Sequence, residues 1–91
     1  MDPQKTLEEA NRAGLDFLTT ELVLARTFLD VAETTSRNEQ RIQSKQDAEK
    51  AYRSVLSFLP QLKIAADTRF DIEQQMKSLN ERLALLRGLS A

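Results

Sequence analysis

The sequence predicts an all-α protein, an antiparallel up-down-up three-helix bundle. Large apolar residues recur at alternating steps of three and four along three segments, which places each set on one side of a helix. No segment alternates strictly between apolar and polar residues, as a half-buried strand does. Only two Gly and two Pro interrupt the 91 residues. The three apolar rows are Leu15, Leu18, Leu22, Ala25, Leu29 and Ala32; Ala48, Tyr52, Val55 and Leu59; and Ile72, Met76, Leu79, Leu83 and Leu86.

The first helix is expected over about residues 3–35. Asp2 can cap its first amides, Pro3 suits the first helical position, and Gly14 is tolerated inside at a cost of about 1 kcal/mol relative to Ala. A second apolar row adjoins the first and widens the apolar surface to roughly 200° of the circumference. This second row consists of Phe17, Leu24, Phe28 and Val31. We therefore expect the first helix to contact two partners at once.

The second helix is expected over residues 36–59. Ser36 followed by Glu39 three positions later fits a capping box at its start. Pro60 ends it, because the residue before a proline is disfavoured in the helical conformation. Residues 60–66 then form a connection that Leu62 and Ile64 anchor to the core. Only the second half of this helix is apolar.

The third helix is expected over residues 67–87. Either Asp67, or Thr68 together with Asp71, can cap its start. Gly88 is predicted to end it as a C-terminal cap, with Leu89 folded back onto the last turn. Short connections make successive helices antiparallel neighbours. We predict one coiled-coil-like helical domain over residues 1–91, whose core a second copy of the chain could complete.

Composition and charge argue against several classes of partner. Thirteen basic and fourteen acidic residues give a net charge of −1 and a pI near 5.4, without the basic excess typical of nucleic-acid binding. The longest apolar run covers residues 22–25, far short of the ~20 residues of a membrane span. The N-terminus lacks the pattern of a secretory signal. We therefore predict a cytoplasmic protein with neither a nucleic-acid nor a membrane partner.

Cysteine and histidine are both absent. This excludes thiol nucleophiles, zinc sites built from these residues and Ser/His catalytic pairs. Carboxylate pairs occur at Glu8/Glu9 and Asp67/Asp71, but a di-iron bundle also needs His ligands. We predict no catalytic residue, no cofactor and no metal, and hence a protein that is not an enzyme; carboxylate-only chemistry has no positive support.

Polar side chains interrupt the apolar rows at two places. Glu21 falls in the middle of the apolar arc of the first helix, where a carboxylate needs a partner. With Tyr52 it could form an interior site for a polar ligand; the alternative is structural, a hydrogen bond to Tyr52 or an ion pair with a Lys between helices. Arg69 precedes the third row, and we expect its stem to lie on apolar surface while its guanidinium reaches solvent or a carboxylate.

Arg37, Arg41 and Lys45 form a basic row at four-residue spacing on the second helix. Such a row could hold an anion or an acidic partner peptide. The alternative is a solvated row that pairs with Glu33 and Glu49, each four residues away along the chain.

Ile42 falls outside the rows, and so do three further apolar residues, Val23, Phe70 and Leu85. Exposed on a common side, the last three would form a self-association surface, for which a symmetric dimer is the commonest arrangement. The leading functional hypothesis is a non-enzymatic protein–protein interaction or scaffold module whose partner is another protein or a second copy. The alternative is a small-ligand or anion-binding module that uses Glu21 and Tyr52 or the basic row.

Overall fold

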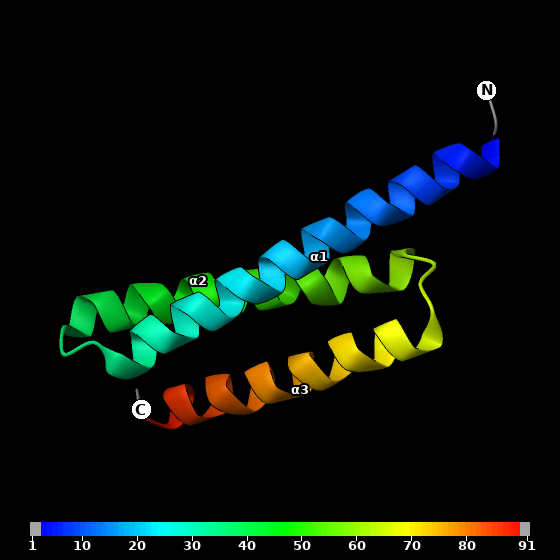
Figure 1. The fold of residues 1–91 in the computed structure, drawn as a ribbon. Coiled ribbons are helices and arrows are strands. Elements are labelled where there is room, and N and C mark those ends of the chain that lie inside the picture. Colours follow the sequence, from blue (N-terminus) through cyan, green and yellow to red (C-terminus); the bar gives the residue numbers. More distant parts are fainter. Residues whose placement is uncertain (1–2, 90–91) are drawn as a thin grey trace.

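Three helices make up the described chain. The computed structural model describes the backbone of residues 3–89 and the side chains of residues 8–88, with α1 at Pro3–Thr34, α2 at Asn38–Phe58, a short 3-10 helix η1 at Leu59–Gln61 and α3 at Ala66–Leu89. Residues 3–89 contain no strand. Figure 1 shows α2 running antiparallel to α1, and α3 returning antiparallel to α2. The predicted all-α, up-down-up three-helix bundle is confirmed.

The three predicted apolar rows form the core. Thirteen of their fifteen members are buried, and the other two, Leu15 and Tyr52, are partly buried and pack against the rest. Ala51 and Leu62 are buried as well. The spacing of apolar residues along each helix therefore predicted which side of it faces the interior.

Gly14 lies where α1 closely approaches the end of α2 and the segment after it. It is buried, and a Cβ atom at this position would collide with Leu62 and lie 3.0 Å from Cε1 of Phe58. The sequence suggested a glycine that α1 merely tolerates. The structure shows instead that the missing side chain makes room for the segment that follows α2.

Thr35, rather than the predicted capping box of Ser36 and Glu39, organises the turn between α1 and α2. The N-cap of α2 is Arg37, which makes no side-chain capping hydrogen bond. The Thr35 hydroxyl accepts a hydrogen bond from the Arg37 amide at 3.2 Å and donates one to Oε1 of Gln40 at 2.7 Å. Because Thr35 already satisfies these groups, α2 begins two residues later than predicted, at Asn38.

The connection from α2 to α3 is fastened by polar contacts to backbone atoms. As predicted, the α-helix ends before Pro60, and the chain continues as η1. The Arg69 guanidinium donates hydrogen bonds to the carbonyls of Leu59, at 3.5 Å, and Leu62, at 2.8 Å. Our expectation that Arg69 reaches solvent or a carboxylate was wrong. It donates to carbonyls at the end of η1, of which that of Leu59 also accepts a hydrogen bond from the Leu62 amide at 3.2 Å.

The two ends of α3 differ in how well they were predicted. It begins at Ala66, one residue before the expected start, and the Asp67 carboxylate accepts a hydrogen bond from the Thr68 amide at 2.9 Å. At the other end the helix continues through Gly88 to Leu89, and no described glycine has a positive φ. The predicted glycine cap is wrong, because Gly88 keeps the helical conformation that its missing side chain also permits. The predicted cap at Asp2 lies outside the described residues.

Charged side chains bridge α3 to both other helices. Arg82 of α3 forms ion pairs with two acids of α1, at 2.7 Å to Asp30 and 2.6 Å to Glu33. Arg87 of α3 forms one with Glu49 of α2 at 3.2 Å. The hydrogen bond with Glu33 is the main cause that raises the pKa of Arg82 above its ordinary value. Arg82 is therefore charged at neutral pH.

Candidate interaction surface

Glu21 lies at the boundary between α1 and α2 rather than inside the core. It is half-buried and lines a shallow hollow of about 310 Å³ together with Lys50 and Ser54 of α2. Within the described part of the chain, no hydrogen bond joins Glu21 to Tyr52. Two structural arrangements were expected from the sequence. The observed one is closer to the second, in which the Glu21 carboxylate emerges between two helices beside a lysine.

The basic row of α2 is spread over different surroundings. Arg37 is exposed at the N-cap, whereas Arg41 and Lys45 are half-buried. The Arg41 guanidinium donates a hydrogen bond to the Thr35 carbonyl at 3.0 Å. It also shares a hollow with Arg82 at the end of the bundle where α3 stops. One member of the row is therefore already engaged with the backbone.

The acids expected to pair with the basic row are used by α3. Glu33 binds Arg82, and Glu49 binds Arg87. Both contacts join residues far apart in the sequence, and both replace a pair at four-residue spacing. The basic row is consequently without the neighbours that local spacing suggested for it.

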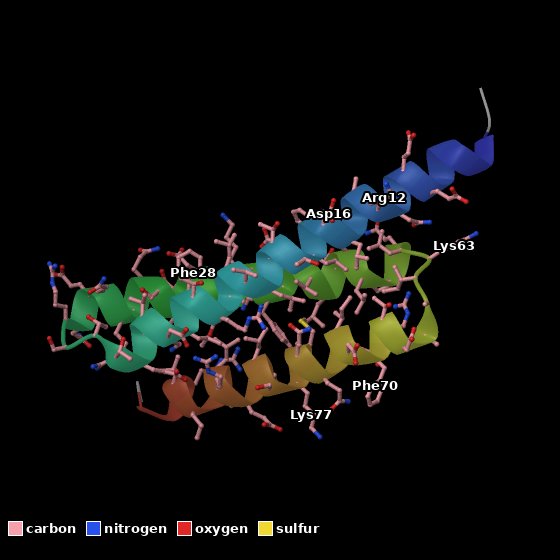
Figure 2. All side chains as sticks on the ribbon, viewed as in Figure 1. Arg12, Asp16, Phe28, Lys63, Phe70 and Lys77 are labelled. Carbon is pink, nitrogen blue, oxygen red and sulfur yellow. The ribbon has the colours of Figure 1, made fainter. Side chains whose placement is uncertain are left out.

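Val23, Phe70 and Leu85 are exposed by 46%, 59% and 71% respectively, but the structure does not bring them together. Phe70 and Leu85 are fifteen residues apart on one helix, roughly 22 Å along its axis. Figure 2 shows Phe70 on the outer side of α3, directed away from α1 and α2. The three residues therefore do not form one continuous apolar patch.

A continuous surface of a different kind runs along α1. Eight positions advance by alternating steps of three and four, the spacing of a coiled-coil seam, and none of them is charged. Most are exposed, including Phe17 at 43% and Leu24 at 39%. Charged residues are 30% of the chain, so this run of neutral positions is distinctive. We call it the uncharged stripe: Ala10, Ala13, Phe17, Thr20, Leu24, Thr27, Val31 and Thr34.

Two of the three threonine hydroxyls in the stripe are satisfied within α1. Thr27 donates to the Val23 carbonyl at 2.9 Å, and Thr34 donates to the Asp30 carbonyl at 2.7 Å. A hydroxyl bonded in this way needs no further partner when it is covered. These two positions can therefore be buried against another helix at little cost.

The stripe faces away from α3 and borders α2. The α3-facing side of α1 carries Arg26, which donates a hydrogen bond to Gln75 at 3.3 Å, and the acids that bind Arg82. On the α2 side, Phe17 packs edge-on against Phe58 with ring centroids 5.2 Å apart. Figure 2 shows Phe28, which flanks the stripe, on the side of the α1–α2 pair opposite α3. The stripe and the α1–α2 groove thus form one face.

Part of this surface was visible in the sequence. The second apolar row of α1 contains Phe17, Leu24 and Val31, and the structure leaves the first two exposed. The small residues at the alternate positions, Ala13 and Thr27 among them, were missed because neither is strongly apolar. The sequence signal that could have revealed them is the lack of charged residues at alternating steps of three and four along α1.

Comparison of the chain with models of protein families, with curated proteins and with solved structures gave no match. No helix among the described residues is long and apolar enough to cross a membrane. The same part of the chain contains no group of three or more Asp and Glu residues placed to hold a metal ion. The function is therefore inferred from the surface of the bundle.

Proposed function

We propose that this chain is a non-enzymatic helical interaction module, and that the uncharged stripe of α1 is its contact surface. The observation that carries the proposal is that a coiled-coil-spaced row of neutral residues, with Phe17 and Leu24 at its centre, is exposed along most of α1. A helix that lies in the groove beside α2, or a second helical bundle, would cover it. Such contacts use anchors at steps of three and four.

Desolvation favours this face over the others. Covering the stripe removes no charged group from water, and burying an unpaired charge is strongly unfavourable. Covering the α1–α3 edge would instead enclose Arg26, Asp30 and Arg82. The uncharged stripe is therefore the face of α1 that can be buried at the least electrostatic cost.

Binding of an anion or a small ligand is the second candidate, and the geometry supports it less. Arg41 is engaged with a backbone carbonyl, and the hollow that it lines also contains Arg82 and the acid Glu33. An anion would have to compete with that carboxylate. The hollow at Glu21 likewise contains two carboxylates, of Glu21 and Asp47, beside one lysine. The cytoplasmic location and the lack of catalytic activity stay predictions from the sequence.

Site-specific photocrosslinking tests the contact surface. A benzophenone side chain is placed at Leu24 in the stripe and, as a matched control, at Lys77 on the outer side of α3 (Figure 2). Purified protein, alone and in cell extract, is irradiated, and protein adducts are identified by mass spectrometry. We expect adducts at position 24 and not at 77, with a partner that binds the wild-type chain in purified form and loses binding to Leu24→Glu. Equal yields at both positions, or none at 24, would refute the proposal.

A further inference from the structure

We propose that the occupant of the uncharged stripe is a second copy of this chain, bound antiparallel across a two-fold axis at the level of Leu22. This proposal rests on the proposed function, since it assumes that the stripe is a contact surface. Two properties of the stripe favour a copy of itself, the order of its side-chain sizes and its area, and the charges around it permit the contact.

In an antiparallel copy of the stripe, the large side chains of one chain fall opposite small side chains of the other. From Ala13 to Thr34, positions that carry large residues alternate with positions that carry small ones. Reversal about Leu22 places every large residue opposite a small one, the condition for interdigitated packing. A parallel copy would set Phe17 against Phe17 and leave threonine opposite threonine. The antiparallel pairs are Ala10 with Thr34, Ala13 with Val31, Phe17 with Thr27, and Thr20 with Leu24.

Charges at the edges of the stripe are compatible with a two-fold axis. On the α2 side, two acids, Glu21 and Asp47, line the same hollow as Lys50 near the centre of the stripe, so each copy presents both signs to the other. On the opposite edge, Val23 lies beside the axis and is 46% exposed. Asp16 and Asp30 lie at equal distances on either side of Val23 along that edge, so each Asp16 faces Asp30 of the other copy. Asp30 is already held by Arg82 at 2.7 Å. Both acids are exposed, so this pair opposes the contact only weakly.

The area of the face suits a small, reversible dimer. The stripe is about 36 Å long from Ala10 to Thr34 at the helical rise per residue, and the two shorter dimensions of the molecule are 21 and 17 Å. A face of this length and the smaller of these widths, which includes the groove beside α2, covers at most about 600 Å² per copy, below the ~800 Å² per partner of a standard interface. We expect a dissociation constant in the micromolar range or weaker, because five of the eight stripe positions carry small residues.

Sedimentation equilibrium over a concentration series tests the dimer. The wild-type chain should approach twice its monomer mass of 10.4 kDa. Leu24→Glu and Thr27→Glu should stay monomeric, whereas Phe70→Glu, a charge on the outer side of α3, should dimerise like the wild type. Thr27 is exposed, so its replacement does not disturb the core, and circular dichroism confirms the helical content of each variant. Dimerisation should change little with added salt, since the central contacts are uncharged.

Single-cysteine crosslinking tests the orientation, because the natural chain has no cysteine. With a short bifunctional maleimide, Val23→Cys should crosslink rapidly. Ala10→Cys should not, since an antiparallel pair separates the two copies of residue 10 by about 36 Å. Rapid crosslinking of both variants would overturn the antiparallel arrangement.

Two further outcomes would overturn the dimer itself. One is a wild-type chain that stays monomeric to millimolar concentration, and the other is a dimer that survives Leu24→Glu and Thr27→Glu but is lost in Phe70→Glu. If the wild type is monomeric while position 24 crosslinks to a different protein that binds through Leu24, this inference fails and the proposed function stands. If position 24 yields no adduct at all, both fail.

Discussion

The contact between α1 and α2 differs in kind from the contacts that hold α3. The backbones of α1 and α2 lie close to each other over a longer stretch than either lies close to α3. The buried residues of these two helices include several small ones, namely Gly14, Ala25, Ala32, Ser44, Ala48 and Ala51. Small side chains at a helix contact let the two axes approach closely. The α1–α2 pair is therefore held by close packing.

Every buried residue described in α3 has a large side chain: Ile72, Met76, Leu79, Leu83 and Leu86. Larger residues fill the space between more distant helices, and long polar side chains span the edges. Arg82 and Arg87 of α3 reach acids on the other helices, and Arg26 of α1 reaches Gln75. The comparison shows that one core can combine a close pair with a third helix held by large apolar residues and by ion pairs.

Truncating a large core residue of α3 should have the largest effect. Leu83 is 0% exposed, and Leu83→Ala should lower the free energy of unfolding by about 3 kcal/mol, from lost burial and the cavity left behind. Urea denaturation followed by circular dichroism measures this. The matched control is Leu85→Ala at a position 71% exposed, where we expect a change within about 0.5 kcal/mol. Equal losses in the two variants would show that α3 does not share the core.

Enlarging a small residue should break the close pair instead. Ala51 is 4% exposed, and Ala51→Leu should destabilise the protein by about 2 kcal/mol, because the extra atoms force α1 and α2 apart. Thermal and urea unfolding provide the measurement. Ala84→Leu, the same substitution at an exposed position of α3, is the control and should be near neutral. A neutral Ala51→Leu would mean that the spacing of α1 and α2 does not depend on small residues.

The fold was predictable because burial is recorded in the spacing of apolar residues. Leu18, Leu29 and Val55 fall in the predicted rows and are fully buried. Thr35 and Gly88 show where this reasoning stops. Several nearby groups can cap a helix with similar free energies, so the choice of Thr35 over Ser36 depends on the turn as a whole. A glycine likewise permits a left-handed cap without requiring one.

The ion pairs were missed because their partners are distant in the sequence. Glu33 lies four residues from Arg37 but binds Arg82, whose position depends on how α3 packs. The candidate interaction surface was hard to predict for the same reason, because it too depends on how α3 packs. A row of neutral residues on α1 becomes a surface only once α3 occupies the opposite side of that helix. Of the three apolar residues singled out in the sequence, only Val23 lies beside this stripe.

Removing the ion pairs of α3 should have the smallest effect of the three. Arg82→Met keeps the apolar stem and should cost about 1 kcal/mol, the upper end for ion pairs near the surface. The raised pKa of Arg82 means that its contribution is fully present below the ordinary arginine pKa and is lost only as pH rises through the higher folded value. Salt is therefore the practical probe, and unfolding at low and high ionic strength should show the difference from wild type shrinking as salt is added.

Arg87→Met, with one pair at 3.2 Å and a side chain 51% exposed, is the matched control and should cost less. A loss in Arg82→Met as large as that in Leu83→Ala, unchanged by salt, would show that packing of the stem rather than charge holds this edge of α3.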